Sequence, residues 1–308
     1  MKRFISLLIA VLLILCTSGC TNPPADTSSK LSVVSTIFPG YDFAKAIAGD
    51  KADVHMLIPP GSETHGYEPT TSDILKITEC DVFIYTAGES DNWITELLKN
   101  SISDDTKVIS LIESAQCDED THSDHSHAGH HHSGVDEHVW TSPVHSMKIA
   151  QSVCDALCEK DTANADYYKG NLDTLLGELT ALDEDFREIT KNGKRNLWVF
   201  ADRYPLTHFS DEYSLEYEAA FSGCSEDTEP SAATVAHLID TVNEHNIPVV
   251  LKIELSSDEI AKTISRETGA EILTFYSCHN ISKDDFENGE TYVSLMQKNV
   301  VTLSKALN

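Results

Sequence analysis

Residues Ala163 to Lys191 read ANADYYKGNLDTLLGELTALDEDFREITK. Apolar side chains recur three or four residues apart along this stretch, which predicts an amphipathic helix with one apolar face. The positions on that face are Leu172, Leu175, Leu176, Leu179, Leu182, Phe186 and Ile189. At 1.5 Å per residue the helix would be roughly 40 Å long, the breadth of a whole domain. We therefore expect a long rigid helix that joins two lobes; a helix packed within one domain is the alternative.

The segments on both sides of this helix alternate between strand and helix patterns, which is typical of a parallel sheet covered by helices on both faces. The strand candidates before the helix are LSVVSTIFP, VHMLIPPG, CDVFIYTAG and TKVISLIES, and those after it are NLWVFA, LEYEAAF, IPVVLKIEL and AEILTFY. The sequence thus predicts an α/β fold with two lobes, each built on a central parallel sheet. The expected limits are 31–145 for the N-terminal lobe, 146–192 for the helical connection and 193–308 for the C-terminal lobe.

The first 30 residues have the pattern of an export signal followed by a tether. Lys2 and Arg3 precede an apolar run from Phe4 to Leu15 that is short for a membrane span, and CTSGC follows it. We expect residues 1–19 to be a signal peptide, Cys20 to be lipidated and residues 20–30 to be a polar tether. The protein would then be anchored to the outer face of the cytoplasmic membrane; cleavage nearby, giving a soluble exported protein, is the alternative.

The chain is strongly acidic, with 50 Asp and Glu against 22 Lys and Arg and a formal net charge of −28. Loss of residues 1–19 would remove Lys2 and Arg3 and no acidic residue, which lowers the net charge from −28 to −30. Such a charge repels phosphate backbones and attracts dissolved cations. Nucleic acid is therefore not an expected partner.

An acidic, His-rich segment covers residues 118–137. Seven of the 14 histidines in the chain lie between Cys117 and Trp140. Imidazole next to carboxylate is typical of first-row transition-metal binding, with zinc the leading metal. We expect this loop to be an accessory metal-binding segment; an acidic solvated loop that happens to be His-rich is the alternative. Its accessory ligands would be His122, His125, His127, His130, His131 and His132.

Two histidines occupy positions where a ligand of an open parallel sheet is expected. His65 lies in PPGSETHGYEP directly after a strand candidate, and His138 lies in DEHVW at the end of the His-rich segment. Ligands of open parallel sheets bind beyond the carboxyl ends of the strands. The expected site is therefore the cleft between the two lobes.

The succession of a lipidation-type signal, GSETHGYEPTTSD, an acidic His-rich loop, DEHVWTSP and a helical connection resembles the metal-binding lipoproteins of bacterial zinc and manganese ABC importers. The resemblance covers nearly all of the mature chain and implies a periplasmic-binding-protein-like fold. A His in H-x-Y-E-P and a His in D-P-H-x-W are metal ligands in that family, which implies this role for His65 and His138. Glu137 stands where the family usually has Pro.

The second lobe departs from the family pattern. A third His in a segment like H-D-A-F-G-Y is common in the family, but here the corresponding stretch is VFADRYPLTHF, with Ala201 where the His would begin. Asp202 and His208 are the two candidate replacements. Asp202 would instead be structural if it pairs with Arg203 or caps a helix.

The family's fourth ligand is often an Asp near the end of the last strand, and here ILTFYSCHNIS offers His279 in its place. The resemblance also implies a disulfide between Cys224 and Cys278, although Cys278 as a thiolate ligand is a competing interpretation. Glu254 ends another strand and is either a reserve ligand or a partner that orients a ligating His.

Four further cysteines lie in the mature chain. Cys154 and Cys158 are four residues apart, which places them on one helix face and suits buried small residues better than a disulfide. The sequence leaves open whether Cys80 and Cys117 form a pair.

A mostly imidazole site favours zinc over manganese, because oxygen-rich sites suit manganese better. The expected function is capture of Zn(II) outside the membrane by a monomer and its delivery to an ABC permease, with Mn(II) as the alternative cargo. A surface adhesin or metal-sequestering lipoprotein is a rival. A zinc hydrolase is a weaker rival, because the chain has no H-E-x-x-H, nucleophile-elbow or Gly-rich phosphate motif. We expect a binding protein, not an enzyme.

Overall fold

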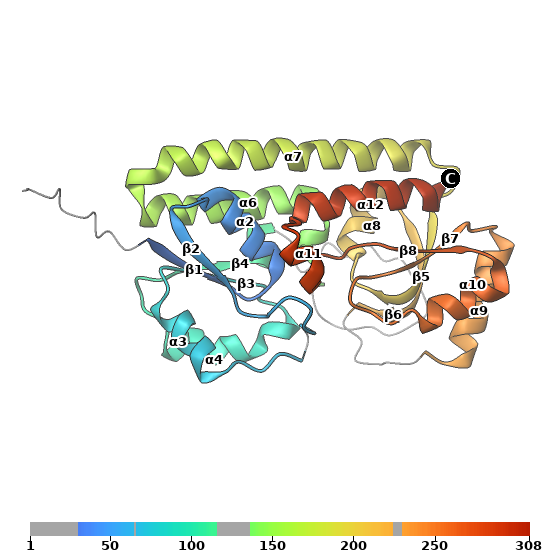
Figure 1. Ribbon diagram of the computed structural model, residues 1–308, viewed down its shortest axis with the longest axis horizontal. Coiled ribbons are helices and arrows are strands. Elements are labelled where there is room, and N and C mark those ends of the chain that lie inside the picture. Colours follow the sequence, from blue (N-terminus) through green and yellow to red (C-terminus); the bar gives the residue numbers. More distant parts are fainter. Residues whose placement is uncertain (1–29, 65, 116–135, 224–229) are drawn as a thin grey trace, which may run out of the picture. The chain divides into compact units, whose positions relative to one another are not determined.

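The computed structural model describes residues 30–64, 66–115, 136–223 and 230–308. Residues 31–308 form one compact unit. Its two halves each contain a four-stranded parallel sheet (Figure 1). The predicted α/β class, with two parallel sheets flanked by helices and a long helix, is confirmed. The predicted lobe limits stay a prediction, because both halves belong to the same compact unit.

The first sheet has the order β2-β1-β3-β4 and the second has the order β6-β5-β7-β8. All neighbouring strands run parallel. Strands of the first sheet are β1 (Leu31–Ser35), β2 (Ala52–Met56), β3 (Val82–Tyr85) and β4 (Lys107–Ser110). Strands of the second sheet are β5 (Leu197–Tyr204), β6 (Glu216–Ser222), β7 (Val249–Lys252) and β8 (Glu271–Thr274).

Helices cover both sheets, as a parallel sheet requires for burial of its two faces. Those of the first half are α2 (Phe38–Ala48), α3 (Thr71–Glu79), α4 (Asn92–Asn100) and α5 (Leu111–Ala115). The connection consists of α6 (Pro143–Lys160) and α7 (Ala165–Asn192). The second half adds α8 (Thr207–Tyr213), α9 (Ala232–Glu244), α10 (Glu259–Thr268), α11 (Lys283–Glu287) and α12 (Tyr292–Leu307). Short 3₁₀ turns are η2 (Glu89–Asp91), η3 (Val139–Thr141) and η4 (Thr162–Asn164).

Helix α7 contacts both halves. It packs against α2 and α6 on the first side and against α8 and α12 on the second (Figure 1). Most of the predicted apolar face is buried, while Leu176 and Ile189 are only partly buried. One hydrophobic core therefore extends from the first sheet, through this helix, to the second sheet. The prediction that the helix joins the two halves is confirmed.

Each sheet also has a smaller core on its opposite face. In the first half Val34 and Phe83 pack with Ile77 of α3 and Ile94 of α4. In the second half the corresponding core joins the sheet to α9 and α10. Among the described residues no helix has the length and apolar character needed to cross a membrane. Cys20 and the predicted signal and tether lie outside the described residues.

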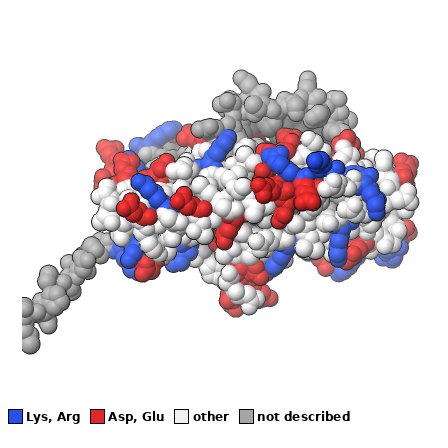
Figure 2. Space-filling model, turned by 90° about the horizontal axis from the view of Figure 1, so that it is seen from above, with Lys and Arg blue, Asp and Glu red and all other residues white. Residues whose placement is uncertain are grey.

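The face that carries α7 is charged but mixed in sign. Figure 2 looks onto this face, where Lys and Arg side chains lie among Asp and Glu side chains. The acidic residues of α7, such as Asp166, Glu184 and Glu188, alternate with its buried apolar positions. This pattern is the polar face of the amphipathic helix that the sequence predicts.

Asp42 is a buried carboxylate that ties α2 to α12. Its Oδ2 accepts the backbone N–H of Tyr292 at 2.8 Å, at the first residue of α12. Burial raises the pKa of Asp42 to about 6, and the charge of Glu178 adds to this increase. The hydrogen bond from the Tyr292 N–H lowers the pKa but does not offset the effect of burial. The folded state therefore holds the Asp42 proton more tightly than the unfolded chain does.

Truncation of Phe186 should show how much the apolar face of α7 contributes. Its ring is fully buried and lies 4.9 Å from the ring of Phe209 and 5.4 Å from that of Tyr213. We expect Phe186→Ala to lower the free energy of unfolding by about 3–5 kcal/mol, measured by denaturant titration. The control Glu184→Ala, on the exposed face, should change it by less than about 0.5 kcal/mol. Equal losses in both variants would contradict a packing role.

Asp42 should make the stability of the protein depend on pH. Because its pKa is raised from 3.8 to about 6, its ionisation costs stability as the pH rises through this range. Asp42→Asn cannot ionise and keeps an acceptor for Tyr292 N–H. We expect this variant to match the wild type near pH 4 and to become more stable by roughly 2 kcal/mol at pH 7. A difference that stays constant between these pH values would contradict the assignment.

Candidate metal centre

His138 is fully buried at the start of η3, just after the His-rich segment. Its Nδ1 lies 2.7 Å from Oδ1 of Asp136, and the same oxygen accepts its backbone N–H at 3.0 Å. A carboxylate that accepts Nδ1–H leaves the lone pair of the ring on Nε2, the arrangement of a metal-ligating His. Burial lowers the pKa of His138, but the charge of Asp136 outweighs this effect and the pKa is raised above its ordinary value.

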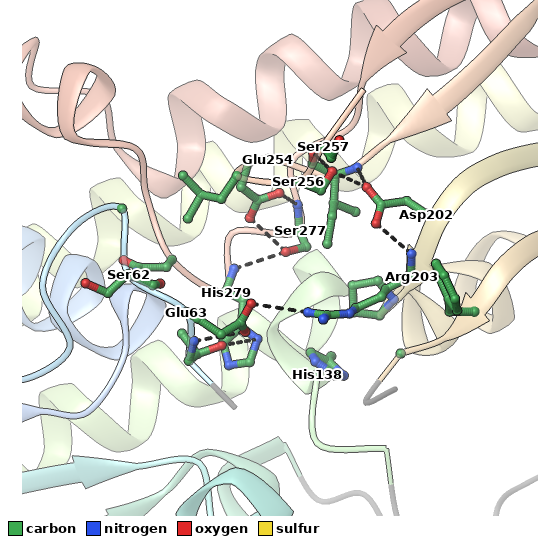
Figure 3. Close-up of a pocket in the computed structure, with 18 of the residues that line it drawn as sticks. Ser62, Glu63, His138, Asp202, Arg203, Glu254, Ser256, Ser257, Ser277 and His279 are labelled. Atoms are coloured by element: carbon green, nitrogen blue, oxygen red, sulfur yellow. Dashed lines mark hydrogen bonds and ion pairs between the residues drawn. The ribbon is translucent and has the colours of Figure 1, made fainter. Parts of the chain in front are cut away.

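His279 reaches the same place from the carboxyl end of the second sheet. It follows β8 in the segment 275–282, and its Nδ1 lies 3.2 Å from Oγ1 of Thr64. When Nδ1–H donates to Thr64, the lone pair is again on Nε2. The rings of His138 and His279 are 5.1 Å apart between centroids and nearly perpendicular (Figure 3). The predicted pair of histidines is therefore brought together by the fold.

Trp140 connects the two segments that carry these histidines. Its Nε1–H donates to the backbone carbonyl of Ser277 at 3.0 Å. Its ring lies 5.4 Å from the ring of His138 and 4.9 Å from that of His279. The hydroxyl of Tyr292 donates to the Trp140 carbonyl at 2.6 Å. This indole therefore fixes the spacing between the two imidazoles.

Glu137 completes a cluster of three buried side chains with metal-binding atoms. Among the residues that the structure describes, one ligand atom each of Glu137, His138 and His279 lie within 4.8 Å of one another. In the sequence, Glu137 is only a departure from the family pattern, directly before an expected ligand. The sequence signal for a role of Glu137 is a carboxylate directly beside an expected buried ligand, because charged residues are rarely buried without a partner.

Glu254 is linked to His279 by hydrogen bonds through Ser277. Its Oε1 accepts the Ser277 hydroxyl at 2.7 Å and its Oε2 accepts the Ser277 N–H at 2.7 Å. The Ser277 Oγ in turn accepts the backbone N–H of His279 at 3.3 Å. Burial raises the pKa of Glu254 to about 7, although these hydrogen bonds oppose it. Of the two predicted roles, the geometry favours the orienting partner.

Asp202 lines the same cavity but lies outside the three-residue cluster. Asp202 lies within β5, where the pairing between β5 and β6 shifts in register between Phe200 and Arg203. Its Oδ1 accepts the N–H of Arg203 at 2.8 Å, and its Oδ2 accepts the N–H of Ile253 at 3.0 Å and the hydroxyl of Ser256. In the structure Asp202 therefore holds the ends of β5 and β7 together.

His208 is placed away from the cluster. Its Nε2–H donates to the backbone carbonyl of Asp136 at 2.8 Å, and its ring lies 5.3 Å from that of His145. It supports the segment that carries His138 and does not line the cavity. The reason is that His208 lies on the first turn of α8, which faces the backbone of residue 136.

The cavity has a volume of about 440 Å³ and opens between residues of both halves. Its lining includes Gly61, Glu63, Thr64, Asp202, Arg203 and Ser277 as well as the two histidines. Nη1 of Arg203 pairs with Oε2 of Glu63 at 3.2 Å across the cavity (Figure 3). This ion pair thus connects the segment that follows β2 with strand β5, at the edge of the metal centre.

Cysteines contribute no atom to the cluster among the described residues. Cys278 is buried in the main core, and its predicted disulfide partner Cys224 lies outside the described residues, so this disulfide stays a prediction. Burial raises the pKa of the Cys278 thiol well above its ordinary value, which does not favour a thiolate ligand. Cys154 and Cys158 are free on one face of α6, as expected, and Cys80 is free and buried.

Several predicted site residues have no described structure. The residues without a described structure are His65, Cys117 and the accessory histidines His122, His125, His127, His130, His131 and His132. Their roles stay predictions from the sequence. The neighbour of His65 on the amino-terminal side, Thr64, contacts His279, so the described chain leads up to the cluster at this point.

Two parallel α/β halves with a buried imidazole and carboxylate cluster define a metal-binding protein of the periplasmic-binding-protein class. The chain belongs to the family described as zinc-uptake complex component A, periplasmic, whose profile matches residues 33–306. The resemblance to metal-binding proteins of zinc importers is thereby confirmed.

Two relatives show how far the similarity extends. The chain is 32% identical over 99% of its length to the zinc-binding lipoprotein AdcA of Streptococcus pneumoniae, of which it spans 61%. It is 31% identical over 95% of its length to the high-affinity zinc uptake system protein ZnuA of Bacillus subtilis, of which it covers 92%. The Zn(II)-bound ZnuA-like domain of Streptococcus pneumoniae AdcA has a similar structure, with a TM-score of 0.76 and 29% identity over 91% of this chain and 99% of that domain.

Asp136→Asn should test whether the carboxylate orients His138. Asn keeps the size of the side chain but removes the charge that holds Nδ1–H. Loss of such a partner typically weakens metal binding about 10–100-fold. We expect a loss of zinc affinity in this range, measured by competition with a chromophoric chelator. The exposed control Asp155→Asn on α6 should bind zinc like the wild type, and equal affinities in all three proteins would contradict the role of Asp136.

Proposed function

We propose that the chain captures Zn(II) outside the cytoplasm in the cavity between its two halves and delivers it to an ABC permease. The observation that carries this proposal is the pair of buried imidazoles of His138 and His279, whose Nδ1 atoms lie beside Asp136 Oδ1 and Thr64 Oγ1. Its family is described as a component of a zinc-uptake complex, and relatives are named zinc-binding or zinc-uptake proteins.

The proposed ligands are His65, His138 and His279, with one carboxylate in the fourth place. Three imidazoles and one oxygen ligand satisfy a tetrahedral Zn(II). Asp202 is the residue that the sequence indicates for the fourth place, with His208 and Glu254 as its alternates. Mn(II) is the alternative cargo, but an imidazole-rich set suits zinc better than manganese.

The N-terminal region and the His-rich segment complete the proposal. Lipidation at Cys20 would hold a monomer at the outer face of the cytoplasmic membrane, close to the permease. Residues 118–137 would bind zinc weakly and raise its local concentration near the cavity by fast exchange. Hydrolysis of a substrate is not part of the proposal, since the family is one of metal uptake.

Competitive titration of the metal-free protein with zinc and manganese should establish the cargo and the site. We expect zinc to displace manganese, and His138→Ala or His279→Ala to weaken zinc binding by more than about 100-fold, beyond the effect of losing an orienting partner. Deletion of Thr121 to Gly134 should remove weak additional sites and leave tight binding intact. Loss of tight binding on loop deletion, with His279→Ala unaffected, would place the site in the loop.

A second measurement separates import from sequestration or adhesion. Cells that lack the protein should take up radioactive zinc more slowly at low external concentration, and His279→Ala should fail to restore uptake. Unchanged zinc uptake in the deletion strain would favour the sequestering or adhesive function.

A further inference from the structure

We propose that Glu137 supplies the carboxylate ligand of the bound zinc, so that this chain's site combines imidazoles with an oxygen from the residue directly before His138. This inference rests on the proposed function and specifies its fourth ligand. No expectation from the sequence assigns this role to Glu137.

The position of the Glu137 carboxylate is the first argument. Its ligand atom lies within 4.8 Å of those of His138 and His279, and the exposed fractions of the three residues are 1%, 0% and 6%. Ligand atoms around a tetrahedral zinc are roughly 3.4 Å apart, given metal–ligand distances near 2.1 Å. The ligand atoms of the cluster would therefore have to approach one another by up to about 1.4 Å around the ion.

The way in which Glu137 is held is the second argument. Its Oε2 accepts the backbone N–H of Ser90 at 3.1 Å and the Ser90 hydroxyl at 3.0 Å. These two donors, from η2 of the first half, engage the same oxygen. The carboxylate is therefore oriented by two donors to Oε2. Carboxylates that ligate metals are commonly oriented by outer hydrogen bonds of this kind.

Gly88 makes room for this side chain. A Cβ added at Gly88 would lie 2.0 Å from Oε2 and 2.4 Å from Cβ of Glu137. Any residue with a side chain would displace the carboxylate from its place beside the histidines. The backbone at residue 88 is thus fitted to Glu137 in this conformation.

The three carboxylates that line the cavity are Glu63, Asp202 and Glu254. Oε1 of Glu63 accepts the Thr64 N–H and its Oε2 pairs with Arg203. Both oxygens of Glu254 accept hydrogen bonds from Ser277. Both oxygens of Asp202 accept hydrogen bonds, from Arg203, Ile253 and Ser256. To bind zinc, Asp202 would have to release donors that join β5 to β7, whereas Glu137 can keep Ser90 as it binds.

The charge of the metal centre predicts how removal of Glu137 should affect zinc binding. A carboxylate reduces the net charge of the metal centre, and the ion in turn compensates a carboxylate that is almost completely withdrawn from water. Removal of Glu137 should therefore weaken binding without disturbing the fold of the metal-free protein. It should also alter the electronic spectrum of a metal bound in the site.

The test compares Glu137→Gln with the wild type, with Asp202→Asn and with the exposed control Glu184→Gln. Zinc affinity is measured by competition with a chromophoric chelator, and Co(II) is used as a spectroscopic probe of the ligand set. We expect Glu137→Gln to bind zinc at least about tenfold more weakly than the wild type and to shift the Co(II) absorption bands. The loss should exceed that of Asp202→Asn, and Glu184→Gln should match the wild type.

A second variant keeps the test independent of folding. Ser90→Ala retains Glu137 but removes one donor to its Oε2, so we expect a smaller loss of zinc affinity with Co(II) bands like those of the wild type. Wild-type zinc affinity and Co(II) bands in Glu137→Gln would overturn the inference, as would a larger loss in Asp202→Asn. Either result would leave the proposed function intact, whereas absence of zinc binding by the wild type would refute the proposed function itself.

Discussion

The hydrogen bond from the indole N–H of Trp140 to the carbonyl of Ser277 is the constraint on which the metal centre depends. It joins the segment before α6 to the segment after β8, two parts of the chain 137 residues apart. Tyr292 adds a second link, because its hydroxyl donates to the Trp140 carbonyl while its backbone N–H is held by Asp42. The distance between His138 and His279 is therefore set by packed aromatic residues in the core.

Charge balance around the two imidazoles follows from this arrangement. Asp136 orients His138 directly, and Glu254 orients His279 through Ser277. Burial raises the pKa of Asp91 to about 6, and the charge of Glu137 adds to this increase. The hydrogen bond from the Thr86 N–H lowers the pKa by less. Several carboxylates thus lie in a region of low water content, where a divalent cation offsets their mutual repulsion. The same groups that orient the ligands also favour a cation in the cavity.

Much of this architecture could be predicted from local patterns. The 3.6-residue period of α7 and the alternation of strands and helices are visible in the sequence because each depends on neighbouring residues. His279 could be placed because ligands gather where parallel strands end, and His138 because DEHVW resembles a ligand segment of the family. Glu137 was not predicted as a ligand, since adjacent side chains of an extended chain point to opposite sides. The turn at His138, with φ −82° and ψ 43°, removes that alternation.

By itself the sequence determined the α/β class, the long connecting helix, the acidic charge and the imidazole chemistry, because these follow from composition and from periodicity within single segments. The tertiary structure decided which polar groups meet. Asp202 and His208 were reasonable ligands from their positions in the chain, yet the fold engages them with Ser256 and with the backbone of Asp136. Such pairings depend on contacts between segments distant in sequence, and no local pattern records which of several carboxylates the packing leaves beside the two histidines.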